Sequence, residues 1–175
     1  MNISSLHYHW DSKETLYRAI FERIYNDLGS LLEEVVVGPH AAGGRRETIH
    51  VAMGLIFDYY AANPTVPRLL MRRIVDSDGS DEESERDLLG SHWETFARWV
   101  REFTDAELPD ADVSFFMLTV QSVLLVLMLG SPHVAAMLGG RIQDARVRDR
   151  LRQQVIALVE RLVGVSSRAE ENQRQ

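Results

Sequence analysis

Near its start the chain reads NISSLHYHWDSKETLYRAIF, residues 2–21, and this stretch decides how the rest of the sequence is interpreted. It predicts a short helix, a break near Trp10, and the start of a much longer helix. Asn2 is a good N-cap for the short helix and Asp11 for the long one, with Glu14 where a capping box needs a carboxylate. Isolated helices below roughly 12 residues are marginal in water. We therefore expect the short helix to be docked, with its polar face available for binding.

The residues from Met1 to Tyr17 also carry a resemblance. The string Ser-Ser-Leu-His-Tyr-His-Trp, followed by Asp-Ser-Lys-Glu and Leu-Tyr, is similar to the end of the DNA-binding helix-turn-helix in tetracycline-repressor-like (TetR) regulators. In that family an aromatic residue and a short polar turn with a lysine follow the recognition helix. A helix then links this turn to a ligand-binding domain. The resemblance implies a ligand-responsive regulator of transcription, expected to be a repressor that binds operator DNA.

The resemblance implies DNA contacts along the short helix and the turn after it. Two serines and a histidine match base- or phosphate-facing positions, an aromatic pair matches positions near the DNA backbone, and a lysine matches a phosphate contact. These residues are Ser4, Ser5, His7, Tyr8, His9 and Lys13. Trp10 matches the buried aromatic residue that seats the helix. His7 and His9 point to different faces of a helix, so we expect no shared metal ion.

The resemblance begins at Met1, so the two helices that precede the recognition helix in the family are missing from this sequence. A helix-turn-helix needs its first helix to aim the second into the major groove. We therefore expect an N-terminally truncated regulator that keeps ligand binding and dimerisation but has impaired specific DNA binding. In-frame codons for two more helices ahead of Met1 would instead indicate a start placed too late.

Composition limits the class of protein. With 175 residues, 45% of them hydrophobic, the chain suits one compact domain, or one domain and a fragment of another. No cysteine is present, which excludes disulfides and thiolate metal sites. The formal net charge of -7 has the wrong sign for wrapping nucleic acid, so any DNA contact must be a small patch. The polar first residues do not resemble a signal peptide, and we expect a cytoplasmic protein.

Apolar residues recur every three or four positions over most of the remaining chain, which is the pattern of amphipathic helices. Turns with glycine or proline separate the segments. The predicted helices cover residues 12–37, 45–62, 65–75, 83–104, 112–129 and 144–163, with a short apolar piece at 134–138. No strand pattern and no internal repeat occurs. The sequence therefore predicts an all-α fold, which with the resemblance becomes a TetR-like helical domain preceded by a partial helix-turn-helix.

The resemblance divides the chain into four parts. Residues 1–11 are interpreted as the remnant of the helix-turn-helix and residues 12–37 as the linking helix. Residues 38–165 form the expected ligand-binding and dimerisation domain, and residues 166–175 a flexible tail. A ligand in this domain is expected to shift the linking helix and so change the separation of two recognition helices in a dimer.

The segment 112–129 is apolar on nearly every side. A membrane span is the obvious alternative, but the run is shorter than about 20 residues and contains Ser114, Thr119, Gln121 and Ser122. We expect no membrane partner and instead expect both faces of this helix to be covered. Two aliphatic stripes on one small domain expose more apolar surface than monomers tolerate, so we expect a homodimer. In the family the last two long helices pair with those of a second subunit.

The predicted dimer interface uses one face of each of these two helices. Its residues are Phe116, Val120, Val123, Leu127, Leu151, Val155, Leu158 and Leu162.

Aromatic and methionine side chains fall on helices that would converge in such a fold. Core packing explains most of them, but ligand pockets are also mostly apolar with a few polar anchors. Tyr60, His92 and Gln121 could supply those anchors. The predicted pocket residues are Met53, Phe57, Tyr60, Met71, His92, Trp93, Phe96, Met117 and Gln121. Together with the resemblance they predict a small apolar or amphipathic ligand.

Other chemistry finds little support in the sequence. The acidic stretch 76–87 mimics a calcium-binding loop, but Gly79 stands at the fourth place rather than the sixth and no glutamate closes the loop. The remaining histidines show no metal-ligand spacing, so we expect no metal and no cofactor. No nucleophile-elbow, Walker or Rossmann pattern occurs, and we expect no enzyme. The alternatives are a dimerisation or ligand-sequestering module that binds no DNA and, less favoured, an uncharacterised helical enzyme.

Overall fold

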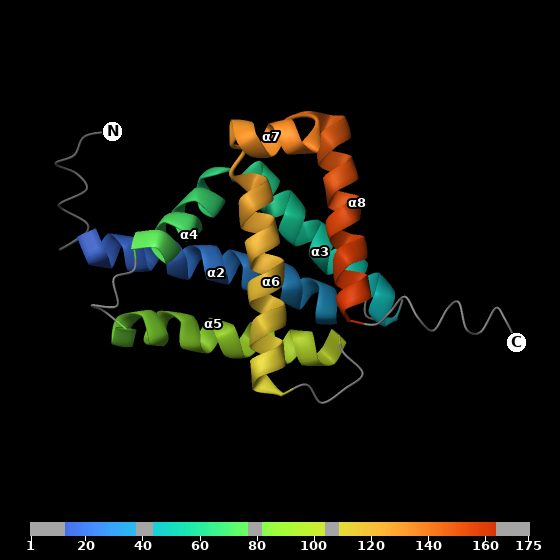
Figure 1. The fold of residues 1–175 in the computed structure, drawn as a ribbon. Helices are drawn as coiled ribbons and strands as arrows, with labels where there is room; N and C mark the ends of the chain where they lie inside the picture. The colour runs from blue at the N-terminus through green and yellow to red at the C-terminus, as the bar shows by residue number, and fades with distance from the viewer. Residues whose placement is uncertain (1–12, 38–43, 77–81, 104–108, 164–175) are drawn as a thin grey trace, which may run out of the picture.

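The computed structural model describes residues 13–37, 44–76, 82–103 and 109–163 (Figure 1). Within these ranges the chain forms seven helices and no strand. In chain order they are α2 (Lys13–Val37), α3 (Arg45–Ala62), α4 (Thr65–Asp76), α5 (Glu82–Phe103), α6 (Asp110–Met128), α7 (Pro132–Leu138) and α8 (Ala145–Leu162). The all-α prediction is confirmed, with helix bounds within two residues of those expected. The predicted recognition helix and the tail lie outside the described residues.

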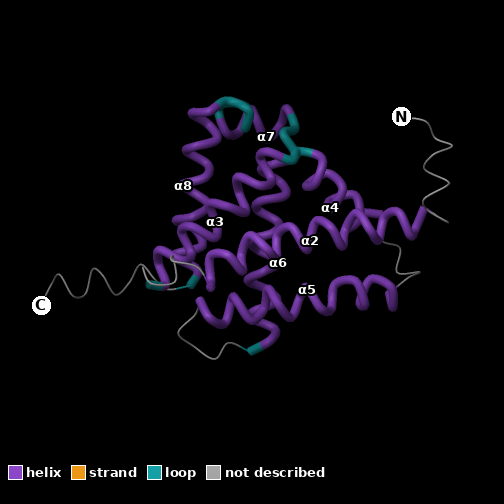
Figure 2. Tube along the Cα trace, turned by 180° about the vertical axis from the view of Figure 1, so that it is seen from behind, coloured by secondary structure: helices purple, strands orange, loops and turns teal. Residues whose placement is uncertain are grey.

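The helices cross in layers rather than forming a parallel bundle. In Figure 1, α2 and α5 run side by side and α6 crosses both of them, while α8 packs beside α3. Figure 2 shows the molecule from behind, and there α2 and α5 again lie side by side. The inner face of α6 packs on four helices, namely α3, α4, α5 and α8.

Helix α2 packs against the core along one of its faces. Its buried side chains recur every three or four residues, as an amphipathic helix requires. They are Phe21, Ile24, Tyr25, Leu28, Leu32 and Val35. Fully burying one side chain of this size contributes about 1.5–3 kcal/mol. The helix is therefore held to the body along most of its length by packing on α3 and α5.

Helix α7 turns the chain between α6 and α8. Ser131 caps its start, with its Oγ accepting a hydrogen bond from the Val134 amide at 3.2 Å, and Pro132 occupies the first turn. Gly139 ends it in the left-handed region with φ of 72°, which favours glycine. Asp144 then caps α8, accepting from the Arg146 amide at 2.9 Å. These local signals bring α8 back against the body.

Two ionic contacts hold α8 to α3. The Nε atom of Arg152 lies 3.1 Å from Oδ2 of Asp58, and the guanidinium passes over Gly54. Further along, the carboxylate of Glu160, which is 7% exposed, lies 3.4 Å from the Arg46 guanidinium. A buried carboxylate without a counterion would be costly, so this pairing fixes the register between the two helices.

Helix α6 is only partly covered. Its buried residues are Val113, Leu124, Leu125 and Met128, while Phe115, Leu118 and Val126 on the outer face are 73%, 54% and 45% exposed. Among the described residues α6 is the one helix long and apolar enough to cross a bilayer by length and composition. Its inner face nevertheless packs on α3, α4, α5 and α8. An apolar outer face on a helix docked by its other face is typical of a surface that contacts a partner.

Candidate ligand cavity

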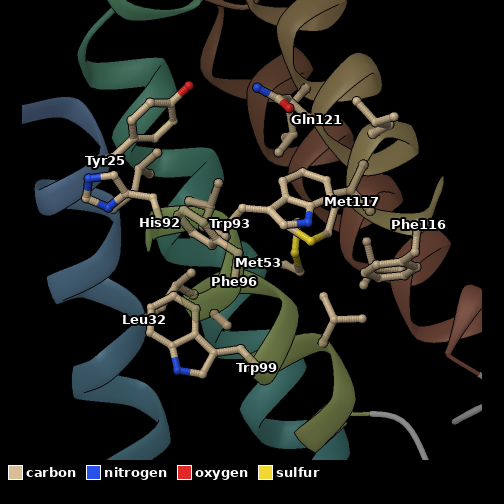
Figure 3. Close-up of a pocket in the computed structure, with 18 of the residues that line it drawn as sticks. Tyr25, Leu32, Met53, His92, Trp93, Phe96, Trp99, Phe116, Met117 and Gln121 are labelled. Atoms are coloured by element: carbon tan, nitrogen blue, oxygen red, sulfur yellow. The ribbon is translucent and has the colours of Figure 1, made fainter. Parts of the chain in front are cut away.

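A cavity of about 450 Å³ lies where α2, α3, α5 and α6 converge, with further wall residues from α4 and the end of α8. Ligand pockets in proteins have volumes of roughly 300–1,000 Å³ and mostly apolar walls. Figure 3 shows its lining side chains directed into a common space from several helices. In size and lining the cavity resembles a small-molecule site.

Seven of the nine predicted pocket residues line this cavity. They are Met53, Tyr60, His92, Trp93, Phe96, Met117 and Gln121. Phe57 and Met71 do not line it, and the prediction for these two is wrong. Phe57 shares a face of α3 with Met53 but is 0% exposed, because the packed core around it leaves it no open space. Met71 packs half-buried against the same core.

Further wall residues were not among the predicted pocket residues. Tyr25 and Leu32 come from α2, Trp99 from α5 and Arg73 from α4. Trp99 also packs at 6% exposure against Leu32. Ile74 is 58% exposed at the cavity edge.

One end of the cavity is polar. The rings of Tyr25 and His92 stack with centroids 5.2 Å apart, and Tyr60 lies near Tyr25. Burial raises the pKa of the Tyr60 phenol, so its hydroxyl stays protonated and can donate a hydrogen bond. The Arg73 guanidinium lies 4.5 Å from the ring centroid of Phe21, one turn before Tyr25 on α2. Positive charge and hydrogen-bonding groups therefore gather at this end.

The other end of the cavity is aromatic and apolar. Phe96 and Trp99 meet edge to face with centroids 5.4 Å apart, next to Leu32. In Figure 3 the ring of Trp93 extends from α5 toward Met117 on α6, with Phe116 beyond it. These walls offer flat apolar surfaces. Gln121 points from α6 into the cavity and adds one neutral amide.

The opening of the cavity can be located from exposure. Among the described wall residues only Ile74 on α4 and Leu118 on α6 are more than half exposed. They mark a mouth between α4 and α6. Arg73 and Ile74 both line the cavity from α4, so the polar end and this mouth share one wall.

The predicted dimer-interface residues fall into three groups. Leu151 and Val155 are 2% and 3% exposed and lie in the subunit's own core, because α8 uses that face to pack on α3. This corrects their assignment to an interface. Leu158 and Leu162 are 37% and 48% exposed and remain available. The α6 set lies half-buried against the core, and its members are Phe116, Val120, Val123 and Leu127.

The outward residues of α6 are offset from the predicted interface face. Phe115, Leu118 and Val126 are the large apolar side chains that reach solvent there. Phe116 and Val120 line the cavity, and Leu118 borders its mouth. The sequence did not predict which side of α6 faces outward, because α6 is apolar around its whole circumference.

A second, smaller hollow lies between α3 and α8. It is lined by Arg46, Glu47, His50 and Glu160. The Nδ1 atom of His50 lies 3.7 Å from a Glu160 oxygen, in addition to the Arg46 contact. In the part of the chain that the structure describes, no three histidine or acidic residues are grouped closely enough to hold a metal ion. This hollow is explained by the ionic tie between the helices.

Of the predicted DNA contacts, Ser4, Ser5, His7, Tyr8 and His9 lie outside the described residues, and Lys13 is the first residue of α2. Comparison with known proteins finds no matching family model, no matching curated protein and no matching solved structure.

Proposed function

We propose that this protein is a dimeric, ligand-responsive regulator of transcription of the TetR-like kind. The cavity would receive a small molecule, and α2 would carry its effect to the DNA-binding segment that precedes this helix. The observation that carries the proposal is the position of α2. It follows directly on the stretch that resembles a recognition helix, and it supplies Tyr25, Leu28 and Leu32 to the cavity wall.

A continuous helix gives a direct mechanical route between the two ends. Helix α2 is 25 residues long, and Tyr25 lies about 18 Å from Lys13 along the axis at a rise of about 1.5 Å per residue. A ligand that displaces Tyr25 or Leu28 would tilt the helix as a unit and move its start. The effector must bind one dimer geometry better than the other for the equilibrium to shift.

Dimerisation is proposed through α6 and α8. The supporting features are the exposed side chains of Phe115, Leu118 and Val126 on α6 and of Leu158 and Leu162 on α8. A second copy would cover these residues in an isologous contact. Two recognition helices placed by such a dimer would enter successive major grooves about 34 Å apart.

A ligand-sequestering dimer without DNA affinity is the second candidate. The net charge of -7 favours it, because negative charge opposes approach to phosphates. It shares the cavity and the dimer with the first candidate and differs only in DNA binding.

DNA selection separates the two candidates. The gene product, including any codons read in frame ahead of Met1, would be used to select duplexes from a random pool. Affinity would then be measured by fluorescence polarisation at several salt concentrations. We expect a two-fold symmetric site with half-sites about one helical turn apart, and weaker binding by His7→Ala but not by His133→Ala on exposed α7. If a gene product that includes in-frame codons for two helices ahead of Met1 enriches no sequence, with affinity set by salt alone, the sequestering module is favoured.

A further inference from the structure

We propose that the cavity takes an anionic amphiphile, namely a small acid with a flat aromatic body whose acidic head lies at the Arg73 end. This inference rests on the proposed function, because it names the chemical class of the effector. It is carried by the uneven distribution of charge, hydrogen-bonding groups and aromatic rings along the cavity.

The charge of the wall selects the sign of the ligand. Among the described residues that line the cavity, Arg73 is the one residue that is always charged, and none is aspartate or glutamate. An ammonium ligand would lose hydration in an apolar site and meet a like charge. A carboxylate would meet the guanidinium, which offers a forked set of donors matched to two oxygens.

The position of Arg73 lowers the desolvation cost of binding a charged head group. Arg73 and Ile74 line the same α4 wall of the cavity, and Ile74 is 58% exposed at the mouth, so a head group bound at this wall keeps part of its water. Tyr25 and His92, stacked at 5.2 Å, lie on the wall beyond it, together with the hydroxyl of Tyr60. These groups can hydrogen-bond the acid from the inner side.

The opposite walls select the body of the ligand. Trp93, Phe96, Trp99 and Phe116 provide ring surfaces, and methionine sulfur makes favourable contacts with aromatic rings. A cavity of about 450 Å³ accepts a ring system of modest size rather than a long flexible chain. Gln121 offers one neutral partner for a polar substituent along the body.

A matched series of probes tests the head group. The probes are 1-naphthylacetate, 1-naphthylacetamide and 2-(1-naphthyl)ethylammonium, which share a ring system and differ in charge. Isothermal titration calorimetry on the full chain measures each affinity. We expect the acetate to bind about tenfold more tightly than the amide, the scale of one charge-assisted hydrogen bond, and the ammonium to bind most weakly.

Arginine variants assign that preference to one residue. In Arg73→Met the acetate should lose its advantage while the amide keeps its affinity, and Arg73→Lys should retain much of the preference. Arg72→Met is the matched control, because Arg72 is exposed, bonds Asp76 at 2.9 Å and does not line the cavity. Thermal unfolding of each variant checks that the fold is retained.

The outcomes separate this inference from the proposed function. Equal affinity for acetate and amide, or the same loss in Arg72→Met as in Arg73→Met, overturns the anionic ligand and leaves a ligand-binding cavity in place. Absence of binding by all three probes to the unmodified chain overturns this inference and also counts against the cavity as an effector site.

Discussion

Tyr25 on α2 and His92 on α5 stack with ring centroids 5.2 Å apart and an interplanar angle of 31°, and both rings line the cavity. The two helices run side by side, so this pair forms a contact between them at the cavity wall. A ligand seated against it would touch both helices at once. Under the proposed function, occupancy of the cavity would thereby change the position of α2.

Filling the cavity should abolish probe binding without unfolding the chain. Val120 lines the cavity from α6 and is half-buried. In Val120→Phe the added ring should enter the empty space, because the cavity has room that a packed core would not offer. We expect naphthylacetate affinity to fall at least about tenfold, measured by calorimetry, with a thermal midpoint equal to or above that of the unmodified chain. Unchanged affinity would mean that the probe binds elsewhere.

Stability should fall steeply at alkaline pH because of Tyr60. Burial raises the pKa of Tyr60 in the folded chain, whereas the unfolded chain releases this proton near the ordinary value of 10.0. The unfolded chain therefore binds fewer protons above that pH, and stability decreases as pH rises. Urea unfolding at pH 8, 10 and 11 should show a smaller decrease for Tyr60→Phe than for the unmodified chain. Parallel curves would contradict this role.

Two helical glycines should respond differently to alanine. A Cβ at Gly29 meets nothing within 4 Å, so Gly29→Ala should stabilise α2 by about 1 kcal/mol. A Cβ at Gly54 would lie 2.2 Å from Nη2 of Arg152, whose Nε bonds Asp58 at 3.1 Å. Because the ion pair must move, the stabilisation by Gly54→Ala should be smaller than that by Gly29→Ala, with a difference of about 1 kcal/mol. Equal gains in urea unfolding would show that Arg152 moves away without cost.

The apolar face of α6 should control the oligomeric state. Sedimentation velocity of the unmodified chain should give twice the chain mass of 19.9 kDa. Phe115→Glu places a charge where Phe115 is 73% exposed and should convert the dimer to monomer. Met137→Glu is the control, since Met137 on α7 is 74% exposed and lies outside the proposed interface. A dimer that survives Phe115→Glu would place the interface elsewhere.

Helix bounds were predictable from the sequence because local chemistry sets them. Asn63 and Pro64 end α3 at Ala62, where predicted, and the glycine pair before Arg45 marks its start. Apolar residues in α2 likewise recur every three or four positions, and Ile24, Leu28 and Leu32 among them are buried. In these segments the spacing of apolar residues predicts which face of the helix packs on the core.

The sequence did not predict in the same way which face of α6 is buried and which is exposed. Phe115 and Phe116 are adjacent and equally apolar, yet one is exposed and the other lines the cavity. Only packing against neighbouring helices decides between them. Leu151 and Val155 were assigned to an interface for the same reason, since a regular stripe on α8 cannot say whether its partner is α3 or a second chain. Arg73 depends on how α4 approaches α2, which no local pattern encodes.

The most direct test of the account measures the movement of α2 in the dimer. The chain has no cysteine, so Glu22→Cys, exposed on α2, gives one spin-label site per chain, and Ala145→Cys on α8 gives a reference. Pulsed electron paramagnetic resonance would record both inter-subunit distances with and without saturating naphthylacetate. The account predicts a shifted distance for the α2 label and an unchanged one for the α8 label. The account would be contradicted if calorimetry verified naphthylacetate binding and the inter-subunit distance of the α2 label were the same with and without naphthylacetate.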